Sequence, residues 1–395
     1  MLAVGRLLSQ IGSGLTLFYA PIFFVDQLGL SATAVGMAIG SQSITGVVGR
    51  LLSGSLVDRL GRKPILLSAM MLSAIGAGIF ALADDLPTLV VGNLCFGLGV
   101  GLYWPANESL VADLTTSSEE RRTAYAFTRL ADNLGMGVGI VGGGLMIQLA
   151  VNYRWLFSLD ALSFIVFAGV IFWGIRETKP QHPSTTSAWG GYLQALRDRR
   201  LQLYLLVNII FTTYMAQLET TMPLYITKFA GGTTAIVTAL FTLNLIMLAV
   251  SQLPVIRWLR PYRHARALGI AASFCGIGFV CTALATIDRS HGWGWLVFTM
   301  IFWAIAIAAY NPTASALTAD IAPVQLMGVY TSLNSLCWAV GFAIGPPLGG
   351  WAMDQSVGIV QIFWGLLALG SLVMWVILLA LDRLLLQSRP APENL

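Results

Sequence analysis

Six ionisable residues lie inside otherwise apolar stretches of this 395-residue chain, namely Arg50, Glu108, Arg129, Asp132, Asp160 and Glu219. A charge within an apolar helix is costly in lipid unless it faces protein or water, so each is a candidate functional residue. Glu219 stands out because the surrounding segment, residues 214–223, contains no basic residue. Such an acid can carry a proton or act as the counter-ion of a cationic substrate. The alternative is a water-exposed or capped acid at the outer mouth of a helix.

The other acids differ in their neighbours. Arg129 and Asp132 are three residues apart, so on one helix they can neutralise each other as a structural pair. Asp160 lies one or two turns from the end of its apolar stretch, and Arg154 is too near the surface to be an assured partner. Asp160 therefore joins Glu219 as a candidate for proton or substrate coupling.

Metal and nucleophilic chemistry find no support in the sequence. The four cysteines lie inside apolar stretches at no metal-ligand spacing, and the three histidines lie between such stretches. An enzyme needs a nucleophile with a base, or a metal cluster. We therefore expect neither a cofactor nor an enzymatic activity.

The composition places these residues in a membrane. Hydrophobic residues make up 56% of the chain and charged residues 10%, against about 25% charged residues in soluble domains. The apolar runs are long and continuous, which predicts helices of about 20 residues rather than barrel strands. We expect twelve spans, at 7–28, 33–56, 65–83, 88–110, 124–149, 155–175, 203–228, 234–254, 267–287, 295–317, 327–351 and 358–380.

Basic residues predict the orientation. Alternate loops, starting from the N-terminus, hold 16 of the 22 Lys and Arg residues, and the opposite loops hold 3. Short cytoplasmic loops collect Lys and Arg, so both termini are expected in the cytoplasm of a multi-pass protein of the inner (plasma) membrane. The net charge of +4 reflects this orientation and does not indicate a nucleic-acid partner.

The twelve spans fall into two halves that repeat each other. The series Pro105, Leu110, Ala112, Asp113 recurs about 207 residues later as Pro312, Leu317, Ala319, Asp320. A polar, proline-bearing linker separates the halves, and its second part, residues 189–200, can form a basic amphipathic helix. We expect a six-helix bundle at 1–175, a linker at 176–202, a second bundle at 203–381 and a cytoplasmic tail at 382–395.

The loop after the second span carries the sequence G-S-L-V-D-R-L-G-R-K-P over residues 54–64. It resembles the signature loop of the major facilitator superfamily of secondary transporters. The resemblance implies two pseudo-symmetric six-helix bundles with a substrate site between them near the membrane midplane. It also implies a cytoplasmic gate in which Asp58 faces the N-terminus of span eleven and Arg62 pairs with Asp113. The expected gate residues are Gly54, Asp58, Arg59, Gly61, Arg62 and Asp113.

Glycines four residues apart mark spans five and eleven. Span five resembles the glycine motif of antiporters in this superfamily, with Ile140 in place of its proline. Such glycines form a flat face on which a second helix packs tightly, and packing alone is the alternative reading. The expected packing residues are Gly135, Gly139, Gly143, Gly341, Gly345, Pro346 and Gly349.

Span four departs from the superfamily at one position. Many proton-driven members carry an arginine there, and this chain has Asn93. Proton coupling must then use other groups. Polar and aromatic residues near mid-span are expected to line a central cavity for an amphipathic ligand, namely Tyr103, Trp104, Asn107, Arg129, Asn133, Tyr214, Gln217, Asn244, Tyr310, Asn311, Asn334 and Trp338.

These features predict an all-α membrane carrier, expected as a monomer, that works by alternating access. The closest resemblance is to the twelve-span drug:proton antiporters, which implies proton-coupled export of amphipathic small molecules. A carrier for a defined metabolite, siderophore or lysolipid would use the same gates with a different cavity. A non-transporting sensor or scaffold is the alternative of another class, and it would normally need a soluble domain that the short loops do not provide.

Overall fold

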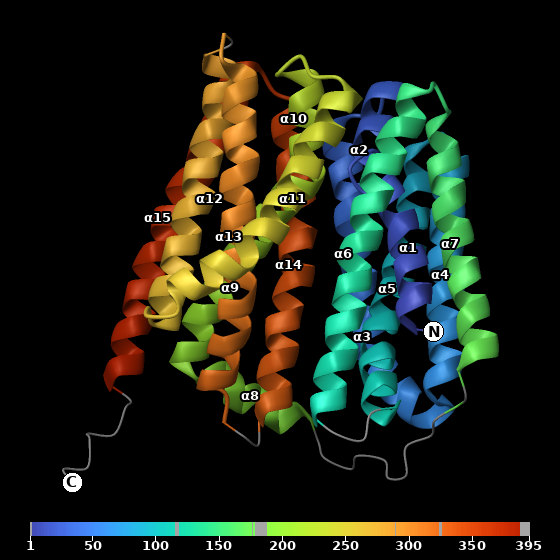
Figure 1. Ribbon diagram of the computed structural model, residues 1–395, viewed down its shortest axis with the longest axis vertical. Helices are drawn as coiled ribbons and strands as arrows, with labels where there is room; N and C mark the ends of the chain where they lie inside the picture. The colour runs from blue at the N-terminus through green and yellow to red at the C-terminus, as the bar shows by residue number, and fades with distance from the viewer. Residues whose placement is uncertain are drawn as a thin grey trace. The chain divides into compact units, whose positions relative to one another are not determined.

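The computed structural model describes residues 2–114, 118–175, 177, 188–288, 290–323 and 326–387 (Figure 1). The side-chain surroundings of Gly54, Asp58, Asp113 and Arg129 lie outside this description. The described chain is helical from end to end and contains no strand, which confirms the all-α prediction.

The first half of the chain forms helices α1 (Leu2–Thr16), α2 (Ala20–Ile22), α3 (Ala32–Leu60), α4 (Arg62–Leu82), α5 (Leu86–Leu114), α6 (Ser118–Gln148) and α7 (Tyr153–Gly174), with a π-helical turn η1 (Phe23–Gln27) after α2. The second half forms α8 (Ala188–Arg197), α9 (Arg199–Ala216), α10 (Met222–Lys228), α11 (Thr234–Leu259), α12 (His264–Ile287), α13 (Gly292–Ile321), α14 (Met327–Met353) and α15 (Val357–Gln387). A second π-helical turn, η2 (Gln217–Thr221), joins α9 to α10.

Eleven helical segments among the described residues are long and apolar enough to cross a membrane. Two of them, Leu2–Gln27 and Arg199–Lys228, each run through a π-helical turn. The remaining expected span corresponds to α3, a helix of 29 residues. Polar residues in the middle of α3, namely Ser41, Gln42, Ser43 and Thr45, lower its hydropathy. Every expected span is therefore matched by a helix.

Local sequence explains several helix ends. Ser31 begins α3, because its hydroxyl accepts a hydrogen bond from the amide of Ala34 at 3.2 Å. Asn152 caps α7 in the same way through the amide of Arg154, at 2.9 Å. Gly61 ends α3 and precedes α4 with a φ angle of +97°, a conformation that residues with a Cβ rarely adopt. These ends lie within a few residues of the expected limits.

The helices form two compact units. Unit 1 comprises Met1–Ser184, Gln217–Thr238 and Phe342–Asp354, and unit 2 comprises Thr185–Ala216, Ala239–Gly341 and Gln355–Leu395. Within unit 1, α4 packs against α5 and α7, and α1 packs against α6 and α7 (Figure 1). Within unit 2, α12 packs against α13 and α15. The repeat in the sequence is thus accompanied by a repeated packing of helices within each unit.

The linker helix α8 is anchored within unit 2. Asp198 follows it and receives hydrogen bonds from the amide of Arg200 at 2.9 Å and from the hydroxyl of Tyr330 at 2.9 Å. Burial raises the pKa of Asp198, but the hydrogen bonds and charge of Arg200, together with Tyr330, outweigh burial and lower this pKa below its usual value. An ionised Asp198 therefore joins the start of α9 to α14.

Candidate functional site

Asp160 is buried between α7 and α1. Asp160 is 2% exposed, and its carboxylate accepts a hydrogen bond from the hydroxyl of Thr16 at 3.1 Å. Gly12 of α1 makes room for it, because a Cβ at Gly12 would collide with the carboxylate. No described Lys, Arg or His lies within ion-pair distance of Asp160. The structure therefore holds a carboxylate inside the bundle with a hydroxyl as its partner.

Glu219 lies in the π-helical turn η2, where the helix of span seven widens by one residue. It is partly buried, and none of the described cations forms an ion pair with it. Its neighbour Gln217 is fully buried and donates to the carbonyl oxygen of Gly345 at 2.7 Å. π-helical turns are frequent at functional sites because they redirect side chains. Asp160 and Glu219 both belong to unit 1.

Asp132 forms an ion pair that sequence reasoning missed. Its carboxylate contacts Arg6 of α1, with Nε to Oδ1 at 2.5 Å and Nη2 donating to Oδ2 at 3.2 Å. The expected partner, Arg129, has a side chain outside the described part. Asn93, at the position of span four where the resemblance implies an arginine, is buried and donates to the carbonyl of Leu89. The cation that pairs with Asp132 therefore comes from α1, and not from α5, which has Asn93 in place of an arginine.

Asp354 closes one end of unit 1, the end that the charge distribution predicts to face outward. Its carboxylate accepts from the amides of Ala32 and Thr33, at 2.9 and 2.8 Å, and from the hydroxyl of Thr33 at 2.6 Å. Lys228 at the end of α10 lies 3.7 Å away. A carboxylate is favoured at the N-terminus of α3 by the free amides and by the helix dipole. Asp354 therefore ties α14 to α3 and α10.

Electrostatics at this end favour the ionised acid. Burial raises the pKa of Asp354, but the hydrogen bonds from Thr33 and Ala32 and the charge of Lys228 outweigh burial and hold the pKa below its usual value. The two helices also approach closely here, because a Cβ at Gly36 or Gly350 would collide with the backbone of the facing helix. The contact is both polar and tightly packed.

The signature loop contacts the end of α7. The carboxylate of Glu177 accepts from the amide of Arg62 at 2.8 Å, and Lys63 donates to the carbonyl of Phe172 at 2.6 Å. Glu177 thus caps α4, and a Cβ at Gly61 would collide with it. Arg59 is exposed and Arg62 is buried. The expected contacts of Asp58 and Asp113, and Gly54, lie outside the described residues and stay predictions.

The glycines of α6 face α1. A Cβ at Gly135 or Gly139 would collide with the backbone of α1, and one at Gly143 would collide with Tyr19. Ile140 stands where the antiporter motif has proline, and its carbonyl accepts a hydrogen bond from the hydroxyl of Tyr19 at 2.7 Å. In α14, Gly341 faces Thr212 of α9 in the same close manner. Within α14, Gly349 packs against η2, and Pro346 packs against α3.

Several residues expected to line a cavity are buried in the helix packing of unit 2. Tyr214 donates to the carbonyl of Leu367 at 2.6 Å, and Asn244 donates to that of Met300 at 2.8 Å. Tyr310 donates to Asn208, which in turn donates to Asn334. Their polar groups are satisfied by neighbouring helices of the same unit. Other expected cavity residues are more open: Trp104, Asn133 and Asn311 are exposed, and Trp338 is partly buried.

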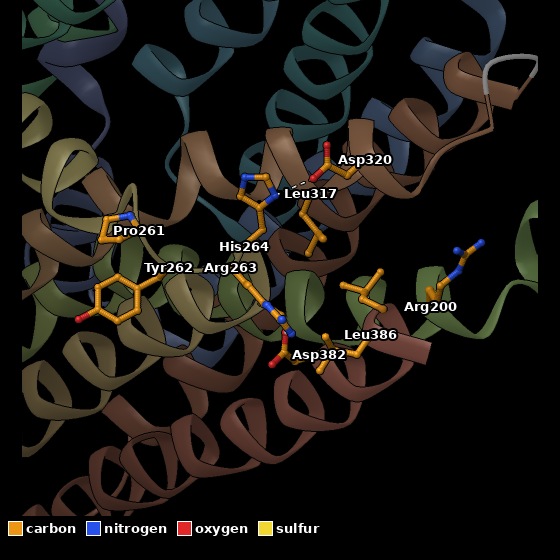
Figure 2. A pocket seen from close by; sticks show the side chains of 11 residues that line it. Arg200, Pro261, Tyr262, Arg263, His264, Leu317, Asp320, Asp382 and Leu386 are labelled. Carbon is orange, nitrogen blue, oxygen red and sulfur yellow. Dashed lines mark hydrogen bonds and ion pairs between the residues drawn. The ribbon is translucent and has the colours of Figure 1, made fainter. Parts of the chain in front are cut away.

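A polar cavity of about 610 Å³ opens at the end of unit 2 that is predicted to be cytoplasmic (Figure 2). His264 Nδ1 lies 2.8 Å from Asp320, and Arg263 lies 3.8 Å from Asp382. Asp320 is the repeat counterpart of Asp113, and the first residue of α12 supplies its basic partner. These two contacts join α12 to α13 and the segment before α12 to α15, whereas Arg200, which also lines the cavity, pairs with Asp198. The described residues contain no cluster that could hold a metal ion.

Known proteins are similar to this chain over nearly its entire length. The family model described as Major Facilitator Superfamily matches residues 2–343 and 231–394. The chain is 27% identical over 380 residues to a protein of Yersinia enterocolitica named multidrug resistance protein MdtH, covering 95% of this chain and 92% of that protein. A protein of the same name from Yersinia pestis is 27% identical over 362 residues, with 89% and 86% covered.

Solved transporter structures have a similar fold. The nucleoside transporter NupG superposes with a TM-score of 0.77 at 14% identity, covering 96% of this chain and 98% of that one. A bacterial homologue of the human lysosomal transporter Spinster, in an inward-facing unoccupied conformation, gives a TM-score of 0.75 at 12% identity, with 99% and 97% covered. At such identities the likeness concerns the fold.

Proposed function

Since this chain belongs to the Major Facilitator Superfamily, we propose that it exports amphipathic small molecules across the inner membrane in exchange for protons. The name of the Yersinia relatives, multidrug resistance protein, supports this substrate class. The distribution of basic residues supports an orientation with both termini in the cytoplasm. The repeat supports two six-helix bundles, 1–175 and 203–381, joined by the linker 176–202.

The coupling proposal depends on one observation, the buried carboxylate of Asp160 with a hydroxyl as its hydrogen-bond partner. An ionised carboxylate in a low-dielectric interior needs a counter-charge, and no described cation of unit 1 supplies one to Asp160. A proton can supply it. Glu219, in η2, is a second carboxylate of unit 1 that forms no ion pair with a described cation. We assign proton transfer to these two acids.

Alternating access requires that each side of the carrier close in turn. The carboxylate of Asp354 supports a closed outer side, since it joins the last turn of α14 to the first turn of α3 through two amides and a hydroxyl. Opening that side would expose these groups to water, which replaces the hydrogen bonds at modest net cost. The contact can therefore be broken and remade during a cycle.

Purified protein in liposomes with an imposed pH gradient tests the proposal. Uptake of lipophilic cations, neutral drugs and lysolipids is measured with the gradient, without it, and after a protonophore. We expect gradient-dependent accumulation of at least one class. Glu219→Gln and Asp160→Asn should each lower accumulation by about 100-fold while monodispersity and helicity remain normal. Transport at the same rate with and without the gradient would refute proton coupling. The absence of transport for all three substrate classes would refute drug export.

A further inference from the structure

Arg6 lies in an environment that resembles a binding site for an organic cation. Its guanidinium carbon lies 4.8 Å from the ring centre of Tyr103 and 4.6 Å from that of Trp104. The two rings meet edge to face, with centres 5.7 Å apart. Asp132 of α6 completes the arrangement through the ion pair with Arg6. One carboxylate and two aromatic faces are the groups that recognise organic cations in proteins.

Helix periodicity places an unused acceptor one turn from Tyr103 on α5. Asn107 lies four residues after Tyr103, on the same face of α5, and is 3% exposed. Its Oδ1 has no hydrogen-bond partner among the described residues. A buried amide oxygen is usually hydrogen-bonded, so its unused capacity indicates a place for a donor that the folded chain does not supply. The protonated amine of a ligand would provide that donor.

The components differ in their access to solvent. The Arg6 side chain is 7% exposed, whereas that of Asp132 is 21% exposed and the residue Trp104 is 37% exposed. Thus the carboxylate and the larger ring can be reached while the guanidinium fills the space between them. A ligand can contact Trp104 and Asp132 before Arg6 has moved.

Arg6 can leave this position without crossing the bundle. It is the fifth residue of α1 from the first described residue, near the helix end that the charge distribution places in the cytoplasm. Long basic side chains near the ends of membrane helices extend toward the interface and keep their charge in water. The cost of releasing Arg6 is therefore smaller than the cost of leaving a cation unpaired at mid-membrane.

We propose that Asp132, Tyr103 and Trp104 form a binding site for amphipathic organic cations, and that Arg6 occupies this site when no substrate is bound. Two positive charges beside the same carboxylate repel each other, so a bound cation and Arg6 cannot occupy the site together. The inference deepens the proposed function and rests on it, because it names cations as the class that unit 1 selects. Anions should not compete with Arg6 for Asp132.

Equilibrium binding tests the site separately from transport. Propranolol, an aromatic secondary amine that is protonated at neutral pH, is titrated against the protein in lipid nanodiscs at constant pH, without any gradient. Asp132→Asn should weaken its affinity at least tenfold, and Trp104→Leu should weaken it severalfold. Arg6→Gln should tighten affinity about tenfold, because the internal competitor is gone. If Arg6→Gln does not purify as a monodisperse protein, Arg6→Lys, whose compact ammonium stacks less well on rings, should tighten affinity by a smaller factor.

A matched control comes from a second pair in unit 1. Asp84 forms an ion pair with Arg154 near the surface, and Asp84→Asn should leave affinity unchanged. Weaker binding in Arg6→Gln would overturn the proposal, since Arg6 would then be part of the site. Unchanged binding in Asp132→Asn would overturn it as well. If these binding changes are observed but no gradient-driven transport is, the proposed function is refuted and the cation-binding site is supported.

Discussion

Unit 1 contains acids in two contrasting settings. Asp132 and Asp354 each contact a basic side chain, Arg6 and Lys228, and Asp354 also binds the first amides of α3. Asp160 receives a hydrogen bond from Thr16, and the described residues provide no cation for it or for Glu219. Acids with a basic partner can position a helix or a ligand through the ion pair. Acids without a cation can change their charge by taking a proton. Acids without a described cation are therefore the candidates for proton coupling, and acids with one are the candidates for a structural or ligand-binding role.

The largest effect is expected from the acids without a cation. Asp160→Asn and Glu219→Gln each remove a group that can exchange a proton, so accumulation driven by a pH gradient should fall by about 100-fold, the scale typical for loss of a proton-transfer group. Substrate exchange without a gradient should persist. Asp26→Asn, at an exposed acid of η1, is the control and should transport normally. Normal accumulation by Asp160→Asn or by Glu219→Gln would show that the acid concerned has no role in proton coupling.

A smaller effect is expected from Asp354→Asn. The amide side chain cannot accept charge-assisted hydrogen bonds, and the change should cost the outer contact about 1.5–3 kcal/mol, the range for hydrogen bonds to charged groups. Spin labels on the adjoining ends of α3 and α14 should then report longer distances in a larger share of molecules. Asp85→Asn removes a carboxylate that caps Thr88 locally and should leave the distances unchanged. Unchanged distances in Asp354→Asn would reduce this acid to a local cap.

The outer contact should also depend on pH. The pKa of Asp354 lies below its usual value in the closed contact. A lowered pKa means that the stabilisation is fully present above the ordinary value, about 4, and is lost as the pH falls through the lowered pKa. The label distances should therefore stay constant from pH 8 to pH 5 and lengthen only below about pH 4. Lengthening at pH 6 would point to another titrating group.

The smallest effect is expected at the opposite end of unit 1, where Glu177 caps α4. Glu177→Gln keeps an acceptor for the amide of Arg62 and removes the charge, so the loss should be about 0.3–1 kcal/mol. A lower midpoint of thermal unfolding with unchanged transport would agree. A large loss of transport would show that Glu177 acts in the gate as well as at the helix end.

Sequence reasoning located the acids without a cation and missed most of the pairs. Glu219 was conspicuous because the segment around it is apolar and uncharged, and the structure places no described cation beside it. Asp132 was assigned to Arg129 because helix periodicity relates residues three apart. Its described partner, Arg6, lies 126 positions away.

The outer contact illustrates the same limit more strongly. Asp354 and Ala32 are 322 positions apart, and both stand at ordinary helix ends where an acid or a small residue needs no special explanation. No motif marks them. In contrast, the signature loop at 54–64 is a local pattern, so the sequence revealed it even though its contact with Glu177 is long-range.

The sequence by itself determined the helices, their approximate positions and the family, because hydrophobic runs, caps and charged loops act within a few residues of each other. The orientation that the basic residues predict stays a prediction. Only the tertiary structure decided which charges meet. A membrane bundle brings together side chains from helices remote in sequence, and a low-dielectric interior makes the presence or absence of a partner decisive for each buried acid. That difference separates Asp160 from Asp132, although both are aspartates in apolar helices.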